Sequence, residues 1–131
     1  MKSFVFNIFD PKNKAYLDIL DQWYKARDWQ PLPATQTGIM VFDENKPICA
    51  GWLYKTDSAI CLISNIISNQ HTSRNKKEAI KFLLENLELE GKKQGFSIML
   101  LFMTVRSITN IAKQNGYIQT GKADELIKNL A

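Results

Sequence analysis

The sequence has few of the side chains that metal centres, disulfide scaffolds and nucleophilic active sites require. It contains one histidine, His71, and two cysteines, Cys49 and Cys61, which stand apart inside apolar stretches. This set offers no metal-ligand spacing, and small secreted domains held by disulfides usually carry more cysteines. A catalytic cysteine would need a histidine or a helix N-terminus close by, and His71 lies in another segment. We therefore predict two buried, reduced thiols and no metal site.

Long apolar runs are also missing. The longest, from Ile98 to Met103, has the length of a strand, whereas a membrane helix needs roughly 18 apolar residues. Asn7, Asp10 and Lys12 interrupt the N-terminal stretch before it could form a secretory signal. We expect a cytoplasmic protein with no membrane partner.

The length and composition are those of one globular domain. The 131 residues are 45% hydrophobic and 23% charged, which is enough for one core, and we expect a single domain over residues 1–131. Although the net charge is only +4, Arg74, Lys76 and Lys77 are clustered, as are Lys92 and Lys93. A local basic cluster suits a phosphate-bearing ligand, and a nucleic-acid binder would more often show a broader stripe.

The N-terminal half predicts one helix and four strands. Apolar spacing indicates a helix from Ala15 to Ala26, and the prolines of residues 28–33 then favour a loop. Alternation and polar turns indicate strands at residues 3–9, 38–42, 47–54 and 59–67. The last three, joined by short turns, form an antiparallel meander. We predict that Trp23, Tyr24 and Trp52 belong to the core.

The C-terminal half begins with a polar loop at residues 68–75. A helix from Lys76 to about Glu90 carries an apolar stripe, and the continuous apolar run 96–103 predicts a strand covered on both faces. Ser107 is a candidate N-cap for a helix that ends at Asn115 and Gly116. Residues 117–120 are expected to form a strand, and residues 124–130 a strand or a short helix.

This order of elements resembles that of the GNAT acetyltransferases, most firmly from Gly38 to Thr120. The resemblance implies an α/β (α+β) fold with a mixed, mostly antiparallel central sheet flanked by helices. The compact length also resembles small phage members of this group. In the family, an Arg/Gln-x-x-Gly-x-Gly/Ala loop and the following helix N-terminus hold the pyrophosphate of coenzyme A.

The matching stretch here runs from Arg74 to Ala79, with Lys77 at the place of the middle glycine. The resemblance thus implies acetyl-CoA as cofactor. It would be bound by Arg74, Asn75, Lys76, Lys77, Glu78 and Ala79. It also implies a slot where the fourth strand diverges from the fifth, at about residues 64–67, with main-chain groups of Ile66 and Ile67 facing the acetyl thioester.

The family's asparagine and tyrosine on the last helix have no counterpart. Their positions fall on Val105 and Ala112, which cannot transfer a proton. Candidate carboxylates for the amine side are Asp57, Asp28 and Asp124, and the spacing does not choose between them. Trp29 and Gln30 are expected to line the acceptor site.

The resemblance implies an N-acetyltransferase that acts on a small-molecule or protein amine, and it allows a homodimer. Because Val105 and Ala112 replace the family's residues, a non-catalytic module that binds coenzyme A or a partner protein is the main alternative. A nucleic-acid-binding domain ranks last, since the aromatic residues lie mostly within apolar runs.

Overall fold

The computed structural model describes residues 4–10, 12–29, 37–71, 75–103, 105–122, 126, 128 and 130. In chain order the elements are β1 Phe4–Ile8, α1 Lys14–Ala26, β2 Thr37–Asp43, β3 Lys46–Tyr54, β4 Ile60–Ser68, α2 Lys76–Lys93, β5 Ile98–Leu101 and α3 Arg106–Gln114. The predicted types of these eight elements are confirmed.

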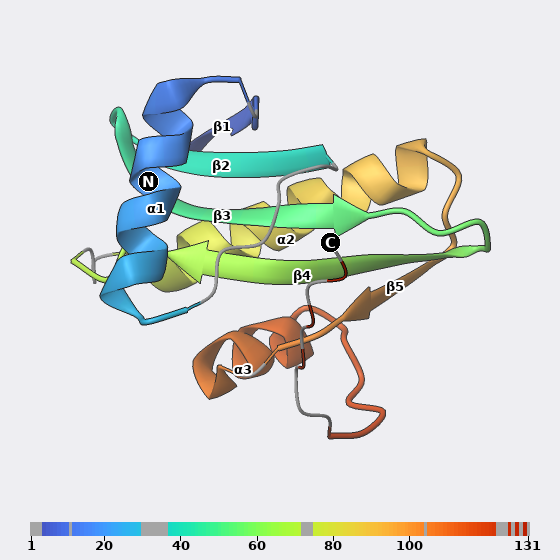
Figure 1. The fold of residues 1–131 in the computed structure, drawn as a ribbon. Coiled ribbons are helices and arrows are strands. Elements are labelled where there is room, and N and C mark those ends of the chain that lie inside the picture. Colours follow the sequence, from blue (N-terminus) through green and yellow to red (C-terminus); the bar gives the residue numbers. More distant parts are fainter. Residues whose placement is uncertain are drawn as a thin grey trace.

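The five strands form one mixed sheet in the order β1-β2-β3-β4-β5 (Figure 1). The first four are antiparallel neighbours, and β5 is parallel to β4. A parallel neighbour requires a crossover connection, and α2 provides it. The sheet matches the expected mixed, mostly antiparallel architecture.

The sheet separates two apolar clusters. The face covered by α1 contains Trp23, Tyr24 and Trp52, as predicted. The other face is covered by α2 and α3, and its cluster includes Ile39, Val41, Leu53, Ile63, Leu83, Leu84, Leu87, Ile108 and Ile111. The two clusters place α1 and α2 on opposite faces (Figure 1).

The predictions for β5 and for the end of α2 need correction. The strand predicted over 96–103 is shorter and is not covered on both faces: β5 spans Ile98–Leu101 at the edge of the described sheet, and Ile98 is 52% exposed. α2 continues past Glu90 because Gly91 lets it pack closely on Cys61 and Met99; an added Cβ would lie 3.1 Å from each sulfur-bearing side chain.

The start of α3 and the segment that follows this helix also differ from the prediction. α3 begins at Arg106 after Val105, which makes no side-chain capping bond, so the N-cap predicted at Ser107 is wrong. Residues 117–120 form no strand, because Gly116 turns the chain at φ 94° and Tyr117 donates a hydrogen bond to Glu88 Oε2 (3.0 Å) on α2. Much of the segment 124–130 lies outside the described residues.

Candidate functional site

β5 ends before β4 does, which leaves an unpaired edge on the described part of β4 that we call the slot. The ladder between them runs from the pair Ile60–Ile98 to the pair Ile63–Leu101, and Phe102 N then donates to Ile63 O (3.2 Å). β4 continues to Ser68 without a neighbour on that side among the described residues, and Figure 1 shows it extending well past the end of β5. The predicted divergence at residues 64–67 is thus present.

A β-bulge lies on β4 beside this slot. Ala50 pairs with Ile67 and Trp52 with Ser64, so two steps along β3 face three along β4. A bulge bends its strand and disrupts the local pairing, which reorients the main chain of residues 65 and 66. The side chains of Ile66 and Ile67 are buried in the two opposite clusters. Only their main-chain groups can therefore face the slot.

Gly51 on β3 makes room for the bulge. A Cβ at this position would lie 3.2 Å from Ile66 Cγ1, 3.3 Å from Leu83 Cδ2 and 3.3 Å from Leu87 Cδ1. These contacts are tighter than a side chain normally makes, so glycine allows Ile66 and α2 to approach the strand closely. The close packing of β3, β4 and α2 fixes the position of the bulge relative to the helix.

At the N-terminus of α2, three main-chain N–H groups have no acceptor among the described residues. Ala79 N donates to Asn75 O (3.0 Å), so the main-chain N–H groups of Lys76, Lys77 and Glu78 precede the first bond of the helix. Asn75 has a left-handed backbone (φ 61°) and makes no side-chain cap. Its Nδ2 is shielded from solvent without a partner among the described residues. Unpaired donors at the positive end of a helix dipole suit an anion.

The predicted motif residues share this helix start. Ala79 is completely buried against the core, whereas the side chains of Lys77 and Glu78 are exposed. Lys77 therefore stands at the place of the family's glycine with its side chain in solvent. The first motif residue, Arg74, lies outside the described residues.

Arg27, which the sequence analysis missed, lies at the same end of β4. It follows the last residue of α1, and its Nη2 donates to Ser68 Oγ (3.1 Å) while its Nη1 donates to Trp23 O (3.4 Å). The guanidinium lies 5.5 Å from the centre of the Trp29 ring, which suits a cation–π contact. No local pattern in the sequence could signal this contact, because Arg27 and Ser68 are 41 positions apart.

Two cations lie where β4 ends and α2 begins: Arg27, bonded to Ser68, and Lys76, the first residue of α2. Burial lowers the pKa of Arg27, and burial together with the nearby Arg27 charge lowers the pKa of Lys76. Like charges held close together repel each other, and an anion placed between them would relieve that repulsion.

The other predicted catalytic and acceptor residues are spread over the molecule. Trp29 is half-buried beneath Arg27, and Asp28 is exposed beside it with φ 54°. Asp57 is exposed in the turn before β4, at the opposite end of that strand from the bulge. Gln30 and Asp124 lie outside the described residues. The structure thus brings Trp29, but not Asp57, to the end of β4 where α2 begins.

Val105 and Ala112 stand at the two positions that, by the resemblance, correspond to the family's asparagine and tyrosine. Val105 directly precedes α3 and Ala112 is buried, and neither side chain can transfer a proton. Both cysteines are buried and unpaired, as predicted, and burial raises the pKa of each thiol. The described residues contain no group of three or more His, Cys, Asp or Glu placed to hold a metal ion. No helix in the described part is long and apolar enough to cross a membrane.

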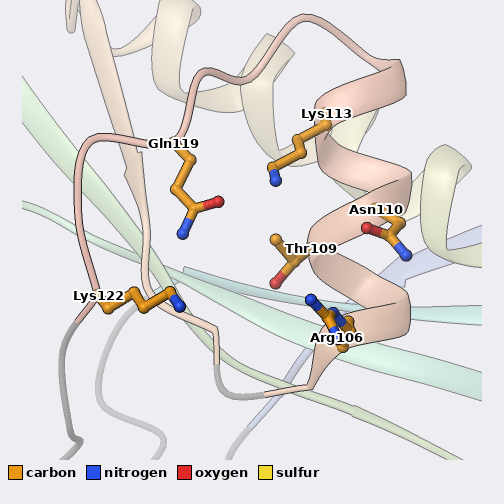
Figure 2. Close-up of a pocket in the computed structure, with 6 residues that line it drawn as sticks. All are labelled: Arg106, Thr109, Asn110, Lys113, Gln119 and Lys122. Atoms are coloured by element: carbon orange, nitrogen blue, oxygen red, sulfur yellow. The ribbon is translucent and has the colours of Figure 1, made fainter.

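A separate hollow of about 460 Å³ lies between α3 and the segment that follows it (Figure 2). From α3 it is lined by Arg106, Thr109, Asn110 and Lys113, and from the following segment by Gln119 and Lys122. The apolar residues of α3 point into the core instead. The hollow is thus a polar feature of the outer face of α3, distinct from the start of α2.

No family model and no curated protein matches the sequence. Several solved structures match its fold. An aminoglycoside 6'-acetyltransferase type Ii is 14% identical with a TM-score of 0.74, covering 89% of this chain and 84% of its own. A ribosomal-protein-alanine N-acetyltransferase from Brucella melitensis biovar Abortus 2308 is 10% identical with a TM-score of 0.70, covering 96% and 100%.

A third similar structure is described as a predicted acetyltransferase with acetyl-CoA, from Clostridium acetobutylicum. It is 14% identical with a TM-score of 0.65, and the match covers 95% of this chain and 96% of that one. At such low identity, these matches establish the three-dimensional arrangement alone. Together with the parallel β4–β5 pair, the slot and the α2 crossover, they show that this chain has the fold of the GNAT acetyltransferases.

Proposed function

We propose that the chain is an acetyl-CoA-dependent N-acetyltransferase. One observation carries the proposal: the bulged end of β4, without a neighbour on one side in the described chain, lies close to Arg27, and the next helix, α2, starts with Lys76 and with N–H groups that have no acceptor among the described residues. Main-chain groups of β4 could bind a thioester in the slot, and the positive charge at the start of α2 could bind a pyrophosphate. In its support, a neighbour of the same fold is described with acetyl-CoA and another with CoA.

The residues at the start of α2 fit a coenzyme pyrophosphate. We assign the pyrophosphate to the N–H groups of Lys76, Lys77 and Glu78 and to the Asn75 amide, whose shielded Nδ2 has no partner in the described chain. Arg74 belongs to this proposed site by its place in the motif, and Ala79 anchors the turn to the core. Lys77 adds a positive charge near the pyrophosphate, which the glycine of the family at this position does not carry.

The slot would position the reacting atoms. When bound, acetyl-CoA supplies the thioester that a neutral amine attacks. Main-chain N–H groups at the bulge, near Ile66 and Ile67, would polarise the thioester oxygen, and pre-oriented donors of this kind stabilise the charge that develops there. Because Ala112 carries no proton donor, we assign protonation of the departing thiolate to water. The amine proton is likewise released to water.

A thermal-shift titration with acetyl-CoA tests the coenzyme site. A ligand at 100 times its Kd stabilises the folded state by about 2.7 kcal/mol, which raises Tm by roughly 5–10 °C in a domain of this size. We expect this shift for the wild type and little of it for K76E/K77E. The matched control is K92E/K93E, with the same charge change at the other end of α2, and it should respond as the wild type does. A wild type that ignores saturating acetyl-CoA would refute the proposal.

The second candidate is a module that binds coenzyme A without turnover. Val105 and Ala112, in place of the family's asparagine and tyrosine, favour it. Release of free thiol from acetyl-CoA across a panel of amines separates the two candidates. A wild type that is stabilised by acetyl-CoA but transfers to no amine would support the second.

We further propose that the protein works in the cytoplasm. The described cysteines are both buried free thiols, and unpaired cysteines are usual where thiols are kept reduced. The acceptor would be a small-molecule or protein amine, since the neighbours are described as aminoglycoside and ribosomal-protein-alanine acetyltransferases. The homodimer stays a prediction, which sedimentation in solution would test.

A further inference from the structure

The hollow beside α3 carries positive charge that no described residue neutralises. Arg106, Lys113 and Lys122 line it, and no carboxylate is among the described residues of its lining (Figure 2). Within the described residues none of these three cations forms an ion pair, and the ion pairs found there lie along α1 and α2. Three like charges around one concavity raise the local concentration of anions.

The rest of the lining is polar and neutral. Thr109 Oγ1 donates to Val105 O (3.3 Å), and Gln119 Nε2 donates to Gly121 O (3.4 Å). The exposed Asn110 amide makes no hydrogen bond to another described residue. Most small-molecule pockets are largely apolar with a few polar groups. A lining made of cations and amides favours a ligand whose binding part is an anion.

The size of the hollow indicates a small molecule. Its volume of about 460 Å³ lies within the range of roughly 300–1,000 Å³ typical of ligand sites. The hollow exceeds what one phosphate or carboxylate group would fill, so a bound anion could carry further atoms. In Figure 2 the side chains of Arg106 and Lys113 extend from α3 toward the same space as Gln119 and Lys122.

The helix that forms one wall of the hollow is the next element after β5 in the chain. Arg106 opens α3 a few residues after Leu101, the end of β5, and the slot begins where β5 ends. The start of α2, where we place the coenzyme pyrophosphate, follows β4 instead. A ligand held at α3 would therefore approach the slot from a different element than the coenzyme does.

We propose that this hollow binds a phosphate or carboxylate group of the acetyl acceptor, which makes the acceptor a small acidic amine. Binding of an anion here is independent of the proposed function, whereas its identification as the acceptor rests on that function. An acidic acceptor differs from the aminoglycosides named for several neighbours. Aminoglycosides carry several amino groups, and a hollow with three cations repels them.

The first test measures inorganic phosphate binding by amide NMR shifts of Thr109, Asn110 and Gln119. We expect saturable shifts in the wild type and at least about tenfold weaker binding in R106E/K113E, since charge-assisted hydrogen bonds are lost and replaced by repulsion. Both positions are exposed, and the same spectra report whether the variant is folded. K12E/K14E, which reverses two charges at the start of α1, should bind as the wild type does. Wild-type spectra without saturable shifts, or an equal loss in the control, would overturn the proposal.

The second test separates the acceptor from the coenzyme's own 3'-phosphate. Affinities for coenzyme A and for 3'-dephospho-coenzyme A are compared in the wild type and in R106E/K113E. We expect the variant to bind both as the wild type does. Weaker binding of coenzyme A alone would place the 3'-phosphate in the hollow and overturn the proposal.

The third test compares acetyl transfer to phosphoethanolamine and to ethanolamine, which differ only in the acidic group. We expect kcat/KM to favour phosphoethanolamine by about tenfold in the wild type, and R106E/K113E to lose this preference. Equal transfer to both, transfer to ethanolamine alone, or transfer to neither would refute the acidic acceptor. Failure of the proposed function itself would appear as no thermal shift with acetyl-CoA, or as no acetyl transfer to any amine of the panel, and the phosphate titration requires neither result.

Discussion

The start of α2 and the hollow beside α3 are two candidate anion sites built in different ways. At α2 the donors are largely main-chain N–H groups, supported by the Asn75 amide and by Lys76, and the bulge of β4 and Gly51 fix their position. At α3 the donors are side chains on an exposed helix face and on the segment after it. The first site depends on how the backbone packs, and the second on which side chains occupy the surface.

This difference determines how each site responds to change. Main-chain donors at a helix N-terminus stay whatever the side chain is, so Lys77 in place of the family's glycine leaves the donors of this candidate site in position. A side-chain site is lost when its cations are replaced, and it is more open to screening by salt. The predictions below, from the largest expected effect to the smallest, test this contrast.

The largest effect is expected from Gly51→Val, which attacks the backbone site through its packing. The added side chain would collide with Ile66, Leu83 and Leu87. Overpacking of this kind costs about 1–3 kcal/mol, and displacement of the bulge should also weaken acetyl-CoA binding. Urea denaturation and the thermal-shift titration measure the two effects. The matched control is Gly121→Val, where an added Cβ meets no atom within 4 Å. Equal losses in both variants would show that the bulge is not packed as described.

Ionic strength should separate the two sites next. Between about 0.05 and 0.5 M salt the Debye length falls from about 14 to about 4 Å. We expect phosphate affinity at the hollow to fall by about tenfold, because its charges are exposed. Acetyl-CoA affinity should fall less, because the donors of α2 lie partly within the protein. Calorimetric titrations at both salt concentrations measure the two affinities. A steeper loss for acetyl-CoA than for phosphate would reverse the contrast.

Lys76→Gln tests whether the charge of Lys76 strengthens acetyl-CoA binding while it lowers the free energy of unfolding. Removing Lys76 relieves its repulsion with Arg27, so the free energy of unfolding without ligand should rise. Since Lys76 is partly exposed, screening limits the gain to a few tenths of a kcal/mol. The same variant should bind acetyl-CoA several-fold more weakly, for loss of one charge-assisted contact. Lys92→Gln is the control at the other end of the helix. A variant that is less stable and binds acetyl-CoA normally would contradict this role.

The smallest effect concerns the hydrogen bond between α2 and Tyr117, in the segment that follows α3. Tyr117 donates to Glu88 Oε2, and burial raises the pKa of Glu88 above its ordinary 4.5. The folded state therefore holds the carboxyl proton of Glu88 more tightly than the unfolded state does. The protonated carboxyl group stabilises the folded state at low pH, and this stabilisation is lost as pH rises from about 4.5 through the raised pKa.

Glu88→Gln removes this titration while keeping an oxygen that can accept from Tyr117. Between pH 4 and 7 we expect the free energy of unfolding of the wild type to fall by a few tenths of a kcal/mol, a small change because Glu88 is partly exposed. The variant should not show this fall. Urea denaturation across that range, taken as the difference between the two proteins, is the measurement. A wild type that gains stability relative to the variant as pH rises would contradict the sign.

The elements with regular apolar spacing were predictable from the sequence. The meander around Trp52, the stripe of α2 through Leu83 and Leu87, and the core side of α3 at Ile108 and Ile111 were confirmed, because period and burial agree there. The structure of residues 117–120 was not predictable, because Tyr117 bonds to Glu88, which lies 29 positions away in the sequence. The N-cap of α3 was misplaced because a hydroxyl at Ser107 suggests a cap that the backbone does not use.

The sequence by itself determined the order of the elements, the apolar faces and the basic cluster around the start of α2, since all of these depend on neighbours along the chain. The tertiary structure decided the bulge at Ser64–Ile67, the contact of Arg27 with Ser68 and the gathering of Lys122 with Arg106 and Lys113. Those features join residues that are distant in sequence. Their positions follow from how the sheet, α1, α2 and α3 pack together, and no local pattern encodes that packing.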